Sequence, residues 1–171
     1  MDLKIRTFET EKDTASVESL FITVNRMLAP PAMEDRFEAY IKASIDEEIG
    51  QIETYYATKI GQFWVAYQHD ILIGMVGIEQ QDNNTMELRR MYVSPNHRRK
   101  GIAHKMLDFV ENWCRNAGVS KMVLSTSELQ PAAISFYEMS GYQLTDESSA
   151  KAASNKTIGG GIRRRYYSKM L

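Results

Sequence analysis

Residues 62–93 constrain the fold more than any other part of the chain. The segment "QFWVAYQHDILIGMVGIEQQDNNTMELRRMYV" contains three runs rich in aromatic and β-branched residues, separated by turn sequences at "QHD" and "DNN". Turns this short join neighbouring strands in an antiparallel arrangement. The segment therefore predicts three consecutive antiparallel strands, which we expect at the centre of a sheet.

A strand and two helices are expected before this segment. Residues 3–8 alternate like a strand, and residues 10–28 carry apolar side chains at helical spacing. The prolines of "APP" at 29–31 end that helix. Residues 33–57 are then expected to form one helix, with an apolar stripe and an acidic, solvated face. The stripe consists of Phe37, Ile41, Ile45, Ile49, Ile52 and Tyr56, and the acidic residues are Glu34, Asp35, Glu38, Asp46, Glu47, Glu48 and Glu53.

The rest of the chain alternates between helix and strand. We expect a helix at 102–116, a strand at 121–127, a helix from Pro131 to Gly141, a strand at 142–148 and a last strand at 162–171. Ile102, Met106, Phe109, Val110 and Trp113 face inward in the first of these helices. The polar, glycine-rich residues 149–161 are expected to form a mobile hairpin loop. This order predicts a single domain, 1–171, with an α/β fold around one mixed sheet.

Composition excludes several classes of protein. The chain has 21 basic and 22 acidic residues, so it has no general positive field for nucleic acid. Its three histidines lack partners at metal-ligand spacing, and we expect no metal. The single cysteine, Cys114, favours a reducing compartment and a packed thiol. A charged N-terminus and short apolar runs predict a cytoplasmic protein without a membrane segment.

The stretch "RRKGIA" at 98–103 is the strongest local sign of a binding site. It follows a predicted strand directly and opens a predicted helix, whose first backbone amides and positive dipole end favour a bound anion. Gly101 permits close approach of a ligand to the backbone. Arg98, Arg99 and Lys100 add positive charge, and arginine can bind phosphate oxygens in pairs. A solvated basic loop is the alternative for so short a pattern.

Two longer segments resemble the GNAT superfamily of acetyl-CoA-dependent N-acetyltransferases. "MELRRMYVSPNHRRKGIAHKML" at 86–107 is similar to the family's fourth strand, pyrophosphate loop and following helix, with "RRKGIA" matching Q/R-x-x-G-x-G/A. "QPAAISFYEMSGYQL" at 130–144 is similar to the later N-x-x-A-x-x-x-Y-x-x-x-G-F segment. Gln130 and Tyr142 stand where the family commonly has Asn and Phe. The resemblance implies a mixed, largely antiparallel central sheet with helices on both faces.

The resemblance also implies which residues hold acetyl-CoA as co-substrate. The backbone amides of 98–103 would bind the pyrophosphate, and the backbone around 91–93 would pair with the pantetheine arm. A β-bulge near Arg90 or Met91 could supply the splayed sheet edge that such pairing needs. An amide near Met91 could stabilise the oxyanion formed during transfer. The cofactor-binding residues are expected to be Met91, Tyr92, Val93, Arg98, Arg99, Lys100, Gly101, Ile102, Ala103, Gln130 and Ala133.

Two residues are candidates for proton transfer. The acceptor amine must lose a proton, and Glu87 is the candidate base, directly or through water. The alternative is an edge carboxylate paired with Arg89 or Arg90. Tyr137, by family match, would protonate the departing CoA thiolate. The alternative is an aromatic side chain packed on the sheet.

The acceptor is expected to be a primary amine of a small metabolite. Within the superfamily the motifs look most like the subgroup of cysteine-conjugate and aspartate N-acetyltransferases, whose acceptors carry carboxylates. Arg89, Arg90 or the run "RRRYY" at 163–167 could bind that group. Open alternatives are a protein, polyamine or antibiotic acceptor, for which the acidic helix would suit a cation, and a CoA sensor without turnover. "LAPPAMED" at 28–35 is expected to border the acceptor pocket, and the final strand could pair with a second copy in a homodimer.

Overall fold

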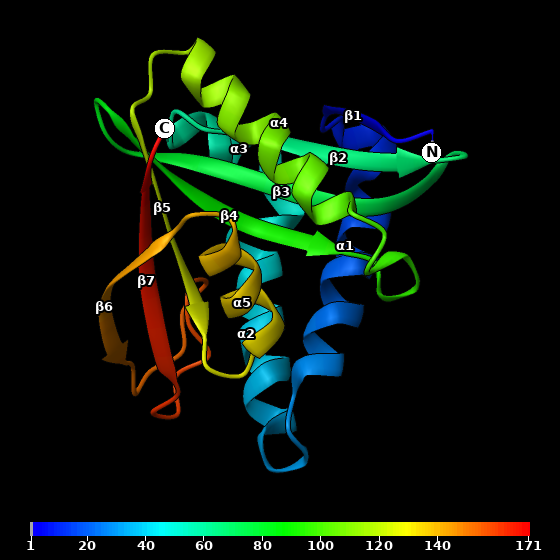
Figure 1. Cartoon of the computed structure of the whole chain (residues 1–171). Helices are drawn as coiled ribbons and strands as arrows, with labels where there is room; N and C mark the ends of the chain where they lie inside the picture. Colours follow the sequence, from blue (N-terminus) through cyan, green and yellow to red (C-terminus); the bar gives the residue numbers. More distant parts are fainter. Residues whose placement is uncertain (1) are drawn as a thin grey trace.

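The computed structural model describes residues 2–171 and contains one seven-stranded sheet in the order β1-β2-β3-β4-β5-β7-β6 (Figure 1). Neighbouring strands are antiparallel except β4 and β5, which are parallel. The predicted antiparallel succession of β2, β3 and β4 is confirmed, with β4 in the middle of the sheet. The strands are β1 (Lys4–Thr7), β2 (Gln62–Gln68), β3 (Ile71–Asp82), β4 (Thr85–Val93), β5 (Lys121–Ser127), β6 (Gln143–Ser149) and β7 (Arg163–Met170).

Helices cover both faces of the sheet, as expected. On one face, α1 (Thr10–Leu28), α2 (Glu34–Glu47) and α3 (Ile52–Thr58) bury Phe21, Phe37 and Ile52 against it. On the other, α4 (Ile102–Asn116) and α5 (Pro131–Met139) pack over a second core. Three short 3-10 turns complete the chain: η1 (Pro31–Met33), η2 (Ile49–Gln51) and η3 (Pro95–His97). No helix within residues 2–171 is long and apolar enough to cross a membrane.

Helix α4 has the boundaries that the sequence predicts. Ile102, Met106 and Val110 are buried, while Phe109 and Trp113 are partly buried and pack edge-on against Trp64 at 5.6 and 5.4 Å between ring centroids. Cys114 is buried on the same helix, and burial raises the pKa of its thiol to about 11. The thiol is therefore a packed side chain that stays protonated at neutral pH.

The prediction of one helix over 33–57 is wrong. Helix α2 ends at Glu47, the backbone of Glu48 turns to φ −140°, and α3 begins only at Ile52. Glu48, expected on the solvated acidic face, is fully buried. Gly50 lets the turn close tightly, because a Cβ there would lie 2.8 Å from the carbonyl oxygen of Ile45. The break directs the Glu48 carboxylate into the protein.

The C-terminal strand is not at the edge of the sheet. Strand β7 lies between β5 and β6, so its backbone groups are already paired on both sides. Pairing of this strand with a second copy is excluded, and β6 and β1 are the free edges. Residues 150–162 do connect β6 to β7, but they fold back over the protein and bury Ile158 and Ile162.

Strands β4 and β5 separate after a short contact. They pair only from Thr85 to Glu87 on β4, and β5 then continues beside β7 while β4 continues beside β3 (Figure 1). The pairing of β4 with β3 shifts by one residue between Arg89 and Tyr92, and Arg90 has a positive φ of 52°. This irregularity is the predicted β-bulge, and it lies where the two strands diverge.

Gly77 on β3 allows a close approach between the sheet and α3. A Cβ at this position would lie 2.6 Å from Tyr56 Oη, whereas one at Gly74 would lie 2.6 Å from the flexible Met106 Sδ.

We expect Gly77→Ala to lower the free energy of unfolding by about 2 kcal/mol, because Tyr56 is a rigid, buried ring. Gly74→Ala is the control and should cost less, since a methionine end can move aside. Urea unfolding measures both, and equal losses would contradict the explanation.

Candidate active site

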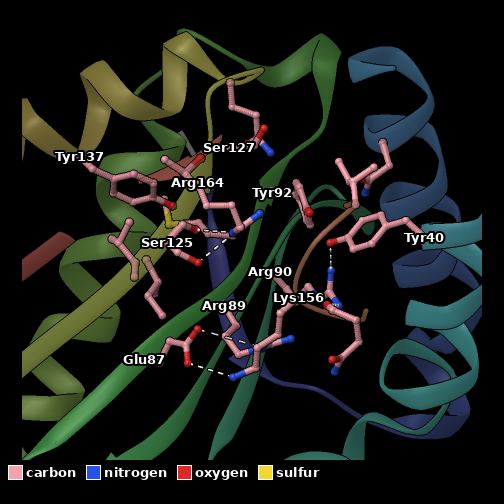
Figure 2. A pocket seen from close by; sticks show the side chains of 18 residues that line it. Tyr40, Glu87, Arg89, Arg90, Tyr92, Ser125, Ser127, Tyr137, Lys156 and Arg164 are labelled. Atoms are coloured by element: carbon pink, nitrogen blue, oxygen red, sulfur yellow. Dashed lines mark hydrogen bonds and ion pairs between the residues drawn. The ribbon is translucent and has the colours of Figure 1, made fainter. Parts of the chain in front are cut away.

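Two cavities lie where β4 and β5 separate. The large cavity has a volume of about 420 Å³ and lies between the end of β4, the start of α4, α5 and α1. The small cavity, of about 90 Å³, lies between the diverging parts of β4 and β5 and is also lined by Asn155, Lys156 and Ile158 (Figure 2). Met91, Tyr92, Gln130 and Tyr137 line both. The two cavities therefore adjoin at these residues.

The loop before α4 presents backbone amides to the large cavity. Arg99 and Gly101 both have left-handed backbone conformations, with φ of 61° and 74°. No side chain caps the N-terminus of α4, and Lys105 N is bonded to Gly101 O at 3.2 Å. The amides of residues 102–104 come before that bond and have no acceptor within the helix. Such an uncapped helix start, beside two arginines, suits an anion.

The structure brings the predicted cofactor-binding residues together, with one exception. The large cavity is lined by Met91, Tyr92, Val93, Arg98, Arg99, Gly101, Ile102, Ala103, Gln130 and Ala133. Lys100 is not among its lining residues, and its ammonium group instead donates to Asn96 O at 3.2 Å. Sequence reasoning missed His104 and Phe136, which also line this cavity and which no motif singled out. Of the segment 28–35, expected to border the acceptor pocket, Leu28 lines the large cavity and no residue lines the small one.

Tyr137 lies at the junction of the two cavities. Its side chain is 8% exposed and packs edge-on against Phe136 and at a 69° tilt against Tyr142. Burial raises the pKa of its phenol well above the ordinary value. The hydroxyl is protonated at neutral pH, and the raised pKa makes it a weaker acid than an exposed phenol.

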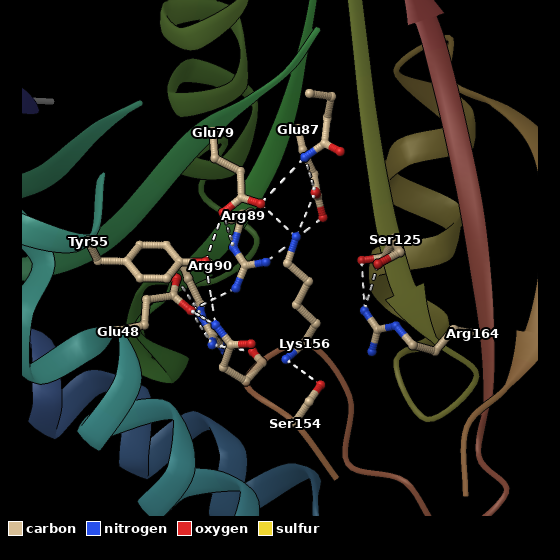
Figure 3. A network of polar contacts seen from close by, with 12 residues as sticks. Glu48, Tyr55, Glu79, Glu87, Arg89, Arg90, Ser125, Ser154, Lys156 and Arg164 are labelled. Carbon is tan, nitrogen blue, oxygen red and sulfur yellow. Dashed lines mark hydrogen bonds and ion pairs between the residues drawn. The ribbon is translucent and has the colours of Figure 1, made fainter. Parts of the chain in front are cut away.

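Glu87 lines the small cavity but has several partners. Gln81 Nε2 donates to it at 2.7 Å, Lys156 Nζ lies at 3.2 Å, and an Arg89 nitrogen lies at 4.0 Å. The alternative, pairing with Arg89, is thus present only at the longer distance of 4.0 Å. Lys156, which the sequence did not indicate as a partner, lies closer. Lys156 comes from the segment between β6 and β7 and also binds Glu79 at 2.6 Å (Figure 3).

Arg89 and Arg90 are not free to bind a substrate carboxylate. Glu48 Oε2 accepts from both guanidinium groups, at 2.7 Å from Arg89 and 2.6 Å from Arg90 (Figure 3). All three side chains are at least nine-tenths buried. Glu48 was missed as a site residue because it belongs to an acidic run that looked solvated. The glycine two positions later, which permits the break, was the available signal.

Arg164 is the arginine of the "RRR" run that faces the small cavity (Figure 2). Its guanidinium donates to Ser125 Oγ at 2.9 Å and to Ser125 O at 3.2 Å. Its neighbours Arg163 and Arg165 pair with Glu147, but Arg164 forms no ion pair with a carboxylate among residues 2–171. The small cavity therefore has one cation whose charge is not balanced locally.

Comparison with known proteins now identifies the family. A family model described as "Acetyltransferase (GNAT) family" matches residues 29–142, which is more than half of the chain. The chain belongs to this family. It is 38% identical over 100 residues to Probable N-acetyltransferase 14 of Xenopus tropicalis, covering 57% of this chain and 48% of that protein. It is 33% identical over 111 residues to N-acetylaspartate synthetase of Danio rerio, covering 64% and 39%. The chain thus spans about half or less of the length of these relatives.

A solved structure confirms the GNAT fold over the whole chain. The crystal structure of the PaiA N-acetyltransferase of Thermoplasma acidophilum in complex with coenzyme A superposes with a TM-score of 0.78 at 20% identity, covering 100% of both chains. In this GNAT chain, residues 2–171 include no group of three or more His, Cys, Asp or Glu arranged to hold a metal ion.

The Glu48 carboxyl makes the stability of this GNAT domain sensitive to acid. Burial raises its pKa, but Arg90 and Arg89 outweigh burial and bring the pKa down to about 2. Because the pKa is lower in the folded state, the ionised carboxyl stabilises the fold at pH values above its unfolded-state pKa of about 4.3. This stabilisation is lost as the pH falls toward 2. We expect Glu48→Gln to remove about 3 kcal/mol at pH 7 and to flatten this acid dependence.

Urea unfolding between pH 7 and pH 2 tests this expectation. Glu47→Gln is the matched control, because Glu47 is the neighbouring residue and is exposed. Its acid dependence should follow the unsubstituted protein. If Glu48→Gln lost stability toward acid as steeply as the unsubstituted protein, the acid dependence would not come from the Glu48 carboxyl.

Proposed function

We propose that this GNAT chain is an acetyl-CoA-dependent N-acetyltransferase that moves an acetyl group directly to a primary amine of a small metabolite. The observation that carries the proposal is the junction of the two cavities at Met91, Tyr92, Gln130 and Tyr137. A cofactor in the large cavity and an amine in the small one would meet there. Direct transfer requires this contact between the two substrates.

The proposed cofactor site uses the large cavity. The uncapped start of α4, with Arg98 and Arg99 beside it, would bind the pyrophosphate of acetyl-CoA. The backbone of 91–93 would pair with the pantetheine arm, since β5 has already separated from β4 at this level. The solved relative in complex with coenzyme A supports a cofactor of this kind.

The proposed reaction forms an N–C bond and breaks the C–S bond of the thioester. The amine nitrogen attacks the acetyl carbonyl, and a backbone amide at Met91 would donate to the oxygen as negative charge develops. The proton that the amine loses would pass to Glu87, directly or through water. Glu87 would first have to exchange Lys156 for the acceptor amine. The departing sulfur of CoA would take the proton of Tyr137, and the phenolate would regain a proton before the next turnover.

Arg164 supports an acceptor that carries a carboxylate. Its guanidinium faces the small cavity and has only the neutral Ser125 as partner. A substrate carboxylate would complete this site by paired hydrogen bonds. The name of the relative N-acetylaspartate synthetase supports the same class, and we propose an amino acid or its conjugate as acceptor. Of the residues considered for this role, we propose Arg164 of the "RRRYY" run rather than Arg89 or Arg90.

Release of free thiol from acetyl-CoA tests the proposed function. The panel contains amino acids, cysteine conjugates, polyamines, aminoglycosides and lysine peptides. We expect turnover with amines that also carry a carboxylate. Turnover only with polyamines, aminoglycosides or peptides would keep the transferase and overturn the acceptor class. Tight CoA binding without turnover in any member would instead indicate a sensor.

Tyr137→Phe tests the proposed acid. We expect kcat to fall about 100-fold or more, with little change in the Kd for acetyl-CoA, because only the transferred proton is lost. Steady-state kinetics and calorimetric titration with acetyl-CoA measure the two quantities. Tyr142→Phe is the control, since Tyr142 is equally buried but lines neither cavity. A similar loss of kcat in both variants would contradict the role.

Arg164→Gln tests the carboxylate site. For a carboxylate-bearing amine we expect KM to rise roughly 10- to 100-fold, because a charged hydrogen-bonded pair is lost. An amine of the same length without the carboxylate should show no such rise. Arg163→Gln is the control, because Arg163 is the neighbouring residue and its exposed guanidinium pairs with Glu147. An unchanged KM for the carboxylate-bearing amine in Arg164→Gln would exclude this site.

A further inference from the structure

Arg90 has a backbone conformation that the rest of the protein must hold in place. Its φ of 52° is unusual for a residue with a side chain and occurs inside a central strand. A conformation of this kind costs about 1–3 kcal/mol and persists only when surrounding contacts determine it. The contacts that do so at Arg90 come from its guanidinium group.

Each nitrogen of the Arg90 guanidinium donates at least one hydrogen bond. Nε donates to Glu48 Oε1 at 3.1 Å, and one terminal nitrogen donates to Glu48 Oε2 at 2.6 Å. The other terminal nitrogen donates to Tyr40 Oη at 2.6 Å. The group also lies 5.1 Å from the centroid of the Phe21 ring, which gives a cation–π contact. The two bonds to Glu48 fix both the position and the plane of the guanidinium.

Glu48 is itself held from several directions. Tyr56 Oη donates to Oε1 at 2.7 Å, and Arg89 donates to Oε2 at 2.7 Å. Asn155, from the segment between β6 and β7, approaches Oε2 at 3.4 Å, and its carbonyl accepts from Arg90 at 2.5 Å. The carboxylate thus joins the break between α2 and α3, the bulge in β4 and the wall of the small cavity.

The bulge determines how the next residue faces the cavities. Arg89 pairs with Gly77 and Tyr92 with Met75, so Arg90 and Met91 together stand opposite the single residue Val76. Met91 follows Arg90 directly and lines both cavities. A rotation of the Arg90 backbone toward ordinary strand geometry would turn the peptide groups on either side of it. The amide of Met91 belongs to one of these groups.

We propose that Glu48 is a positioning residue for acetyl transfer, which anchors the Arg90 guanidinium and so holds the β4 bulge that directs the Met91 amide into the junction of the two cavities. This inference rests on the proposed function for its consequence in catalysis. The structural part, that Glu48 holds Arg90 at the bulge beside Met91, is argued from the contacts of Glu48 and Arg90 and from the register of β4, and it does not depend on the proposed function. A buried ion pair can serve in this way to select one backbone arrangement.

The test compares Glu48→Gln with a matched control, Asp13→Asn. Asp13 is also fully buried, and it accepts from Arg6 at 2.7 Å and from Tyr67 Oη at 2.8 Å. It lies at the β1 edge of the sheet, away from β4. Both substitutions remove one buried carboxylate that binds a tyrosine; Glu48 also binds two buried arginines, whereas Asp13 binds one that is 24% exposed. Asp13→Asn therefore controls for the loss of a buried, arginine-bound carboxylate, while the effect on Met91 should differ.

The first readout needs no turnover. In protein labelled with ¹⁵N-methionine, the Met91 amide signal is assigned by its loss in Met91→Leu. We expect Glu48→Gln to shift this signal, while the signals of the exposed Met139 and Met170 stay in place. Asp13→Asn should leave the Met91 signal unchanged. A Met91 signal that does not move in Glu48→Gln, or that moves equally in both variants, would overturn the proposal.

The second readout separates positioning from stability. With the best acceptor of the panel, we expect Glu48→Gln to lower kcat on the order of 10- to 100-fold, as for a misplaced catalytic group. The Kd for CoA should change less than about threefold, because the pyrophosphate site is separate from the bulge and only the first residue of the proposed pantetheine pairing, Met91, belongs to it. Asp13→Asn should keep kcat. Loss of affinity in proportion to kcat, or an unchanged kcat, would contradict a positioning role.

A substitution at Arg90 that keeps the bulge without the contact to Glu48 provides a rescue test. Glycine adopts positive φ without strain, so Arg90→Gly can keep the bulge without the guanidinium. In that background, Glu48→Gln should lower kcat much less than it does alone. An undiminished effect would place the role of Glu48 elsewhere.

If Glu48→Gln does not fold, Tyr40→Phe provides a second variant, because it removes one acceptor of Arg90. It should shift the Met91 signal in the same direction as the proposal predicts for Glu48→Gln. No shift would count against the proposal.

If no member of the panel is acetylated, the Met91 signal still decides the structural claim. If acetylation occurs while that signal is unaffected by Glu48→Gln, the proposed function stands and the positioning role fails. The two proposals can therefore fail independently.

Discussion

The separation of β4 from β5 is the constraint on which the rest of the site depends. Two parallel strands that stayed paired would satisfy one another's backbone groups and leave no space between them. Here the pairing ends at Glu87; the small cavity occupies the gap that follows, and the large cavity adjoins it at the end of β4. The bulge at Arg90 and Met91 turns β4 at the same level. A sheet built in this way presents backbone groups and side chains to a ligand without breaking its core.

The charges around the gap are nearly balanced within the protein. Glu48, Glu79 and Glu87 contact Arg89, Arg90 and Lys156, so three carboxylates face three cations. Buried charges persist only when they are paired in this manner. Because Arg164 lies outside this cluster, its charge is available to a ligand. The pattern of pairing, more than the number of arginines, thus indicates what the small cavity can accept.

Local sequence patterns predicted most of the elements but not the contacts between distant ones. The boundaries of α4 followed from Gly101, Gly118 and an apolar face of regular spacing. The break at Glu48 was missed because Ile45, Ile49 and Ile52 continue the helical spacing across it. The partners of Glu48 lie 41 and 42 positions away, and no local pattern relates them.

The place of the last strand could not be predicted for a similar reason. Its alternation shows that residues 162–171 form a strand, whereas its position between β5 and β6 depends on long-range pairing. The cofactor-binding residues, by contrast, lie in two short motifs, and all but Lys100 line one cavity. Motifs whose chemistry is local are therefore the part of the site that a sequence conveys best. Lys156 and Arg164 line the small cavity from elements far apart in the chain, and Glu48 contacts its wall through Arg89 and Arg90.

A crystal structure of the chain with acetyl-CoA tests the central claim most directly, namely that the gap between β4 and β5 is the place of acetyl transfer. The account predicts pyrophosphate oxygens on the amides of 98–103, the pantetheine arm along 91–93 and the thioester at the junction beside Met91 and Tyr137. Acetyl-CoA bound elsewhere, or bound in the large cavity with its thioester directed away from the small one, would contradict the account.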